Sequence, residues 1–179
     1  MRILVIGDFH YPNRAKYPTE VFNFLKSQKF DLILCTGDLT DISILKELNK
    51  FGPVKIVQGN MDWDVQHPNR HIITIQGIKI GLIHGNQIRP RGNLKKLAEY
   101  AKKLDLNILI SGHTHTQSII KYINNLLLIN PGSATGAWSF LADHIPSFII
   151  LKINEIEIKI INYQMIENRF ESRKEIFRI

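Results

Sequence analysis

At 179 residues, with 44% hydrophobic and 22% charged residues, the chain has the length and composition of one folded domain, which excludes a disordered protein. No apolar run approaches the roughly 20 residues that span a bilayer, and the N-terminus lacks the features of a cleavable signal, so we expect a cytoplasmic protein without membrane insertion. The net charge of +7 favours anionic partners in general, but the basic residues form no single block, and the sequence therefore does not predict nucleic-acid binding.

Short apolar runs alternate with amphipathic segments in the first third of the chain. Strands are expected over Arg2–Ile6, Leu32–Cys35 and Val54–Val57, where β-branched and other apolar residues cluster. Helices are expected over Pro18–Gln28 and Asp41–Lys50, where apolar residues recur on one face. This alternation predicts parallel strands joined by right-handed crossovers.

The middle of the chain begins with a hairpin. Two expected strands, Ile72–Ile75 and Lys79–Ile83, flank Gln76-Gly77, which indicates a tight turn. A helix over Leu94–Leu104 and a strand over Asn107–Ile110 follow.

The last third of the chain is mostly strand. Four more strands are expected, over Ser118–Ile123, Leu126–Ile129, Ser147–Ile153 and Glu155–Tyr163. The dipeptide Asn124-Asn125 suits a tight hairpin because Asn tolerates positive φ. Since no repeat or linker interrupts the pattern, we expect one α/β domain over residues 1–179, with a mixed sheet or two packed sheets covered by helices.

Glycine beside a potential metal ligand follows five of the expected strands. The five motifs are Gly7-Asp8-Phe9-His10, Gly37-Asp38, Gly59-Asn60, His84-Gly85 and Gly112-His113-Thr114-His115. Strand ends at one edge of an α/β sheet converge on a crevice, and glycine there leaves room for an ion or a substrate. A single such motif is more often a turn or a cap, but five in this order indicate a functional site.

Together the motifs supply two carboxylates, one amide and four imidazoles, a set that suits divalent cations. Seven ligands exceed what one ion normally needs, so the sequence predicts two metal ions that share a bridging Asp. His67, His71 and His144 follow no such strand end, and we assign them no metal. Cys35 lies in an apolar run and is expected to be a buried packing residue.

The five motifs resemble those of the calcineurin-like metallophosphoesterase superfamily in full. The resemblance implies a four-layer αββα sandwich, in which helices flank two mixed β-sheets and a dinuclear centre lies at the strand ends. It assigns the first metal to Asp8, His10 and His115, the second metal to Asn60, His84 and His113, and the bridging position to Asp38. Two divalent ions, drawn from Mn, Zn, Ni, Co and Fe, are the implied cofactors.

The activity that the resemblance implies is hydrolysis of a phosphoester, above all a phosphodiester, by a hydroxide that bridges the metals. Asn60 would both bind a metal and orient the phosphate. One position departs from the family, because the histidine that protonates the leaving group in many members is Met61 here. General-acid catalysis contributes roughly 10²–10⁴-fold, so its loss predicts slow turnover or a preference for good leaving groups. Asp62 is the nearest substitute acid, or else it supports the residues around it.

A closer resemblance extends over essentially the whole chain. The segment Asn130–Ala137, together with the histidine motifs before it and Ile145–Phe148 after it, is similar to the small-subunit family of the retromer sorting complex. Small microbial phosphodiesterases share the same core motifs. The retromer family implies an alternative function, a scaffold in protein transport whose metal pocket and apolar surface dock a helical-solenoid partner. Met61 fits this alternative as well as it fits a weak enzyme.

The exposure of five large apolar residues would distinguish the enzyme from the scaffold. Trp138, Phe140 and Leu141 follow the Pro-Gly-Ser loop, while Trp63 and Ile88 lie just beyond metal-binding motifs. An enzyme would pack these side chains under loops or use them as the rim of a substrate site. A scaffold would expose them as anchors for its partner.

Overall fold

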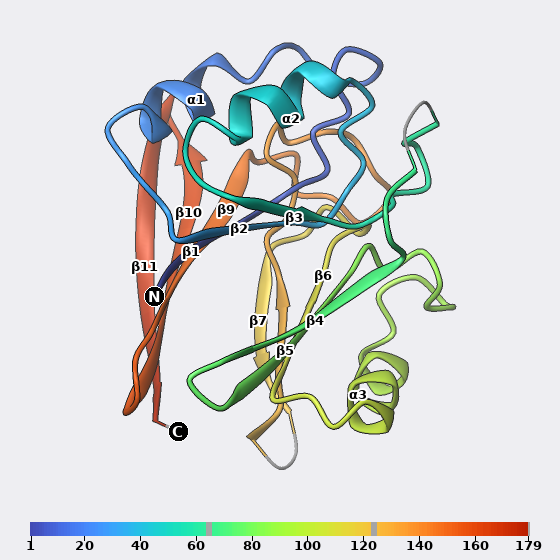
Figure 1. The fold of residues 1–179 in the computed structure, drawn as a ribbon. Helices are drawn as coiled ribbons and strands as arrows, with labels where there is room; N and C mark the ends of the chain where they lie inside the picture. The colour runs from blue at the N-terminus through green and yellow to red at the C-terminus, as the bar shows by residue number, and fades with distance from the viewer. Residues whose placement is uncertain (64–65, 123–124, 179) are drawn as a thin grey trace.

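The structure of the chain is a computed structural model that describes residues 1–63, 66–122 and 125–178 (Figure 1). The strands of a first sheet are β1 (Arg2–Ile6), β2 (Leu32–Cys35), β3 (Val54–Ile56), β9 (Ser147–Ile153), β10 (Glu157–Ile166) and β11 (Arg169–Arg178). Those of a second sheet are β4 (Arg70–Ile75), β5 (Ile78–Ile83), β6 (Ile108–Ser111), β7 (Ser118–Lys121) and β8 (Leu127–Asn130). The helices described are α1 (Thr19–Leu25), α2 (Ile42–Leu48) and α3 (Leu94–Lys103).

Both sheets mix parallel and antiparallel strands. The first sheet has the order β11-β10-β9-β1-β2-β3, and the second has the order β4-β5-β6-β8-β7. Strands β1, β2 and β3 run parallel to one another, as the sequence predicted, and so do β5, β6 and β8. The other pairs are antiparallel, including the predicted β4–β5 hairpin around Gln76 and Gly77.

The two sheets pack face to face, and helices cover their outer faces (Figure 1). Side chains of β1 alternate between two cores, because Ile3 and Val5 enter the core between the sheets while Leu4 and Ile6 pack beneath α1 and α2. Helix α3 covers the outer face of the second sheet through Leu97. The predicted four-layer αββα fold, with helices flanking two mixed sheets, is therefore confirmed.

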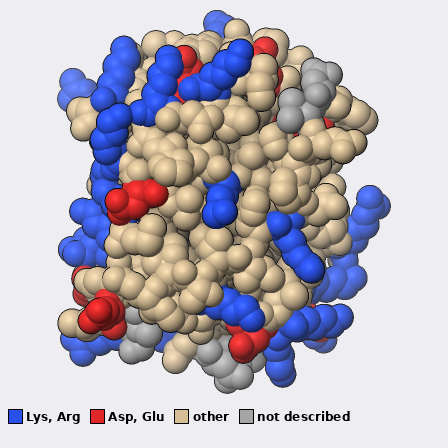
Figure 2. Space-filling view, viewed as in Figure 1, with Lys and Arg blue, Asp and Glu red and all other residues tan. Residues whose placement is uncertain are grey.

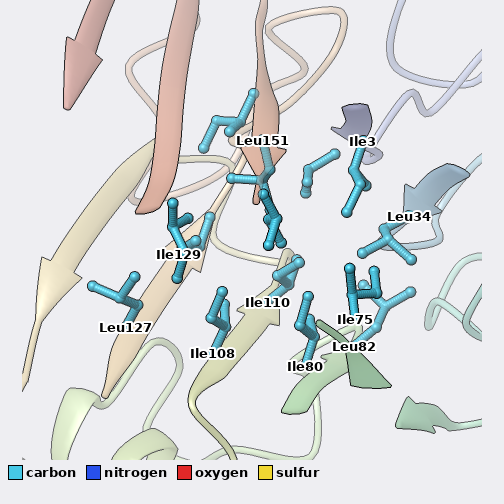
Figure 3. Packing of buried hydrophobic residues seen from close by; sticks show 14 of the residues in the cluster. Ile3, Leu34, Ile75, Ile80, Leu82, Ile108, Ile110, Leu127, Ile129 and Leu151 are labelled. Carbon is cyan, nitrogen blue, oxygen red and sulfur yellow. The ribbon is translucent and has the colours of Figure 1, made fainter. Parts of the chain in front are cut away.

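The core between the sheets consists of aliphatic side chains contributed by both of them. In Figure 3, Leu34 and Leu151 of the first sheet face Ile80, Ile108 and Ile110 of the second. Burying one side chain of this size stabilises the fold by about 1.5–3 kcal/mol. This packing fixes the two sheets against each other, and with them the strand ends that both sheets contribute to one edge.

Most of the predicted helices and strands differ from the observed ones by one to three residues at an end. Helix α1 ends at Leu25 rather than Gln28, because the chain turns there and the Gln28 N–H donates to the Leu25 carbonyl. The predicted turn at Asn124 lies outside the described residues. The bounds predicted for β1, β2 and β9 are confirmed.

Strand β11 was not predicted. It pairs with β10 from Glu157↔Arg178 to Ile166↔Arg169 and forms the edge of the first sheet. Most of its residues are charged and exposed, so it shows little of the apolar pattern that indicates a strand. Charges on an exposed edge also oppose pairing with other chains.

On the face drawn in Figure 2, most Lys and Arg side chains lie toward the margins, with Asp and Glu side chains among some of them, and the middle of the face is largely uncharged. Among the described helices, none combines the length and apolar character needed to cross a membrane.

Candidate metal centre

The seven predicted ligands follow the carboxyl ends of β1, β2, β3, β5 and β6, so both sheets contribute to one site. Five of the seven have left-handed backbone conformations, with φ between 51° and 69°. These five are Asp8, His10, Asp38, His113 and His115. Such conformations are unfavourable for residues other than glycine and cluster at functional sites, because the surrounding structure must hold them.

Two glycines make room for the carboxylates. A Cβ atom on Gly59 would overlap the carboxylate of Asp38, and one on Gly112 would overlap the carboxylate of Asp8. Any side chain at either position would displace the carboxylate, so the glycine of each motif is required by close approach rather than by a turn alone.

Asp8 and Asp38 lie at the middle of the site and are almost fully buried. The Nε2 atom of His115 is 3.3 Å from Oδ1 of Asp8, and the Nε2 atoms of His10 and His84 are each 3.4 Å from Oδ2 of Asp38. The Nε2 atoms of His10 and His115 face each other at 3.0 Å. Five buried side chains therefore direct their polar atoms to one small volume.

These five side chains form two overlapping groups that could each hold a metal ion. Asp8, His10 and His115 make one group, and Asp8, Asp38 and His84 make the other. Within each group, the candidate ligand atoms lie within 4.8 Å of one another. Asp8 belongs to both groups. Oδ2 of Asp38 lies 3.4 Å from His10 Nε2, in the first group, and 3.4 Å from His84 Nε2, in the second.

The remaining two predicted ligands adjoin His84. The Oδ1 atom of Asn60 is 3.0 Å from His84 Nε2, and the ring of His113 lies edge-on to that of His84, with centroids 5.0 Å apart. Asn60 is exposed and His113 is half-buried, so this side of the site opens to solvent. The structure thus brings all seven predicted side chains together.

Backbone carbonyls orient two of the histidines. Nδ1 of His84 lies 2.8 Å from the Thr36 carbonyl, and Nδ1 of His115 lies 2.8 Å from the Ala137 carbonyl. A proton on Nδ1 satisfies each carbonyl and leaves the Nε2 lone pair directed into the site, the usual arrangement of metal-binding histidines.

Thr36 contacts two of the predicted ligands, and sequence reasoning missed it. Its hydroxyl donates to Oδ2 of Asp8 at 3.2 Å, and its carbonyl accepts from His84. It thereby connects β1, β2 and β5. The only sequence signal was its position directly before Gly37-Asp38.

Lowered pKa values keep two of the four imidazoles, those of His10 and His113, neutral at pH 7. Burial lowers the pKa of His10 to about 4 and that of His113 to about 3. Burial would also lower the pKa of His115, but its hydrogen bond with Asp8 and the charge of that carboxylate raise it. Neutral imidazole is the form that binds metal.

The pKa values of the two buried carboxyl groups shift in opposite directions. Burial raises the pKa of Asp38 to about 6, although the charge of His84 opposes the shift. Burial would raise the pKa of Asp8 as well, but the hydrogen bond with His115 and the charges of the surrounding histidines outweigh it and lower that pKa. Both groups are mainly ionised at pH 7.

Asp62 lies next to this set, and both of its carboxylate oxygens accept backbone hydrogen bonds. Oδ1 accepts from the amides of Leu39 and Thr40 at 2.8 and 3.0 Å. Oδ2 accepts from the amides of Asp38 and Gly59 at 2.8 and 3.0 Å. Each oxygen is occupied in holding the loops that carry the predicted ligands, which favours the supporting role over that of a substitute acid.

The donor set fits a divalent cation. Buried carboxylates need a compensating positive charge, and among the described residues the ion pairs of Asp8 and Asp38 involve only histidines. Imidazole and carboxylate together suit Zn, Mn, Co, Ni and Fe.

The other residues singled out in the sequence fall into two groups. Cys35 and Ile88 are buried, and burial raises the pKa of the Cys35 thiol, so both are packing residues. In contrast, four of the large apolar side chains are exposed. They are Trp63 and, from one loop, Trp138, Phe140 and Leu141. His71 Nε2 lies 2.9 Å from the Ile56 carbonyl, and His144 is exposed.

The family model of the calcineurin-like phosphoesterase superfamily domain matches residues 1–155. A probable metallophosphoesterase of Methanothermobacter thermautotrophicus is 41% identical over 157 residues, which cover 86% of this chain and 87% of the relative.

Solved structures of similar fold include two Vps29 proteins. Vacuolar protein sorting 29 of Cryptosporidium parvum superposes with a TM-score of 0.94 at 30% identity, over 99% of this chain and 98% of that one. Vps29 of Entamoeba histolytica, solved in complex with Zn²⁺, superposes with a TM-score of 0.92 at 37% identity, over 98% of this chain and 99% of that one.

Proposed function

The chain belongs to the calcineurin-like phosphoesterase superfamily, and on that premise we propose that it is a phosphodiesterase that works with two divalent metal ions. The observation that carries the proposal is the pair of overlapping groups, in which five buried carboxylate and imidazole side chains direct their ligand atoms to one volume. Buried groups of this kind are costly to the fold, and metal binding compensates the cost.

The proposed ligands are divided between two ions. Asp8, His10 and His115 would hold the first, Asn60, His84 and His113 the second, and Asp38 would bridge them. The position of Asp38 Oδ2, 3.4 Å from both His10 and His84, supports the bridging role. Mn, Zn, Ni, Co and Fe all fit this donor set.

When bound, the ions would lower the pKa of a water molecule and offset the negative charge of a phosphoryl group. The residues of the chain prepare this chemistry. Asp38 and Asp8 supply anionic ligands, Asp62 holds the Asp38 and Gly59 loops, and the exposed Asn60 amide can orient the phosphate. Met61 supplies no proton to a leaving group, so substrates with good leaving groups should react fastest.

The test uses one purified sample for metal content and activity. The metal-free protein is reconstituted with Mn²⁺, Zn²⁺, Ni²⁺ or Co²⁺, and hydrolysis of bis(p-nitrophenyl) phosphate is followed. We expect metal-dependent release of p-nitrophenol, reduced at least about 100-fold in Asp38→Ala and in His84→Ala. Two bound ions without turnover under any of the four metals would overturn the enzymatic proposal.

A second candidate function is partner docking, and one observation favours it. Trp138, Phe140 and Leu141 are 53%, 85% and 52% exposed, and the rings of Trp138 and Phe140 contact each other with centroids 4.8 Å apart. The patch adjoins the metal centre, because the Ala137 carbonyl orients His115. Contiguous exposed aromatic side chains are typical of interaction surfaces.

The docking function predicts stable association with a helical-repeat protein. Affinity purification of the tagged chain, followed by identification of bound proteins, should recover such a partner, and Phe140→Ala together with Trp138→Ala should release it. Recovery of the tagged chain alone at physiological salt would contradict this function.

A further inference from the structure

Two arginines from different loops lie beside the proposed metal ligands. Arg91 follows β5, and its Nη2 atom donates to the His113 carbonyl and lies 3.3 Å from Nδ1 of the same residue. Arg14 follows β1, and its Nη2 atom lies 3.9 Å from the sulfur of Met61. The charge of Arg91 acts on Asp8, His113 and His115, while that of Arg14 acts on His10 and on Arg91 itself.

Within the described ranges, neither guanidinium forms an ion pair with a carboxylate. The ion pairs of Asp and Glu with Lys or Arg side chains found there are all made by lysines. Nε of Arg91 is buried without a hydrogen-bond partner among the same residues, although the side chain is half-buried. An arginine held partly out of water with unused donors is poised for an anion, since a guanidinium binds phosphate through two parallel hydrogen bonds.

Met61 and Asp62, which follow Asn60, supply no proton to a leaving group. The Met61 thioether carries no proton, and both oxygens of Asp62 accept backbone amides. A strongly basic alkoxide would leave slowly from such a site, whereas a phosphate is a far weaker base and leaves without a proton.

We propose that this site acts on phosphoanhydrides, and that Arg14 and Arg91 bind the leaving phosphate. The inference rests on the proposed phosphoesterase function and specifies its substrate class. Two arginines beside two metal ions supply more positive charge than one diester phosphate needs, and a second phosphate group matches the excess.

The reaction is a hydrolysis of one P–O bond. The oxygen of water forms a new bond to phosphorus, and the bond from that phosphorus to the bridging oxygen breaks. The bridging oxygen keeps the electron pair and departs as an oxygen of the second phosphate, which faces the guanidinium groups. One proton of the water remains on the products, and the other passes to the solvent.

Binding measurements separate the second phosphate from the rest of a ligand. The metal-loaded protein is titrated calorimetrically with AMP and with α,β-methylene-ADP, which differs by one non-hydrolysable phosphoryl group. Metal content is measured before and after each titration, so that loss of metal to the ligand is detected. Arg14→Gln, Arg91→Gln and Arg91→Lys are compared with Arg89→Gln, which removes the same charge from an exposed position on the Arg91 loop.

We expect α,β-methylene-ADP to bind about tenfold more tightly than AMP. Arg14→Gln and Arg91→Gln should each reduce this ratio several-fold with metal content retained, Arg91→Lys should restore part of it, and Arg89→Gln should leave it unchanged. Equal affinities in the unmodified protein, or a ratio insensitive to both glutamine variants, would overturn the inference. Because Arg14 is exposed, its variant is informative even if a change at Arg91 impairs folding.

Activity distinguishes failure of this inference from failure of the proposed function. Hydrolysis of the aryl diester without any preference for the diphosphate ligand leaves a phosphodiesterase and removes the phosphoanhydride assignment. The other outcome is that the protein binds α,β-methylene-ADP more tightly than AMP through the arginines but hydrolyses neither ADP nor the aryl diester. That result would contradict both the enzymatic function and the assignment of phosphoanhydrides as substrates.

Discussion

Asp62 supports the centre from beside it, and its replacement tests how much the loops depend on one carboxylate. In Asp62→Asn, the amide nitrogen must face backbone N–H donors, so at least two of the four hydrogen bonds are lost. Hydrogen bonds to charged groups contribute about 1.5–3 kcal/mol each, and we expect the free energy of unfolding to fall by about 3 kcal/mol. Urea unfolding of the metal-free protein measures this change.

The matched control for Asp62→Asn is Asp105→Asn. The Asp105 side chain is fully exposed and lies beyond the helix α3, so this variant should change the unfolding free energy by less than about 0.5 kcal/mol. Equal urea midpoints for the two variants would show that the Asp62 hydrogen bonds contribute little.

The ionisation of Asp38 predicts how metal affinity depends on pH. The pKa of Asp38 is raised to about 6, so its carboxylate gains a proton as the pH falls from 7 to 5 and metal must displace that proton. His10, with a pKa of about 4, stays mainly neutral over this range and adds little, whereas the raised pKa of His115 means that this imidazole also takes up a proton. Mn²⁺ affinity should therefore fall at least about tenfold between pH 7 and pH 5, measured calorimetrically on the metal-free protein.

Asp38→Asn is the control for this pH dependence. The asparagine has no titrating group, so affinity should be lower at every pH, and its fall between pH 7 and pH 5 should be smaller by about tenfold, with His115 responsible for what remains. An affinity in the unmodified protein that is flat from pH 7 to pH 5 would contradict the role of Asp38.

The positions of the predicted ligands could be found in the sequence because each one follows an apolar strand beside glycine. Gly59 and Gly112 are required because a Cβ atom would overlap a carboxylate, and this requirement appears in the sequence as a glycine beside the ligand. Thr36 and Arg91 leave no such mark. Thr36 acts partly through its backbone carbonyl, and Arg91 reaches His113 from a neighbouring loop, so both depend on tertiary placement.

At the scale of elements, strands were predictable where burial dictates composition. β1 and β2 are buried on both faces and contain continuous apolar runs, so their bounds were predicted correctly. β11 lies at an edge, where only a few residues pack, and its charges conceal a strand that hydrogen bonds along the whole of β10. Backbone pairing leaves no trace in composition, which explains why this strand was missed.

Replacement of Phe170 tests how much the packing of β11 contributes to stability. Its ring contacts Phe24 and Phe148, with centroids 5.3 and 5.0 Å away. Because the side chain is half-buried, Phe170→Ala should lower the free energy of unfolding by about 2 kcal/mol, less than a fully buried phenylalanine would cost. Ile176→Ala, at an exposed position of the same strand, should cost under about 1 kcal/mol in the same urea experiment. The reverse order of the two losses would contradict this packing.

At the scale of the molecule, the candidate site lies where the two sheets meet. Asp8, Asp38 and Asn60 follow strands of the first sheet, while His84, His113 and His115 follow strands of the second. The sequence predicted convergence of strand ends, but it did not decide between one mixed sheet and two packed sheets. The division depends on which strands pair, and pairing between distant segments is set by the whole core.

Because ligands from both sheets would share the ions, metal removal should weaken the whole fold. Metal at about 100 times its dissociation constant adds about 2.7 kcal/mol to the free energy of unfolding. For a chain of 179 residues, this corresponds to a Tm that is about 5–10 °C higher with metal than with chelator. Scanning calorimetry with Mn²⁺ and with EDTA measures the difference.

Two histidine variants distinguish metal linkage across the sheets from a general effect of the chelator. His84→Asn removes a proposed ligand contributed by the second sheet, so the difference in Tm between Mn²⁺ and EDTA should shrink by at least half. His144→Asn changes an exposed histidine with a left-handed backbone that asparagine tolerates, and the full difference should persist. The same shift in both variants would mean that Mn²⁺ stabilises the protein from outside the centre. Loss of the shift in His84→Asn alone would mean that a ligand after β5 controls the stability of a fold whose other sheet supplies both carboxylates.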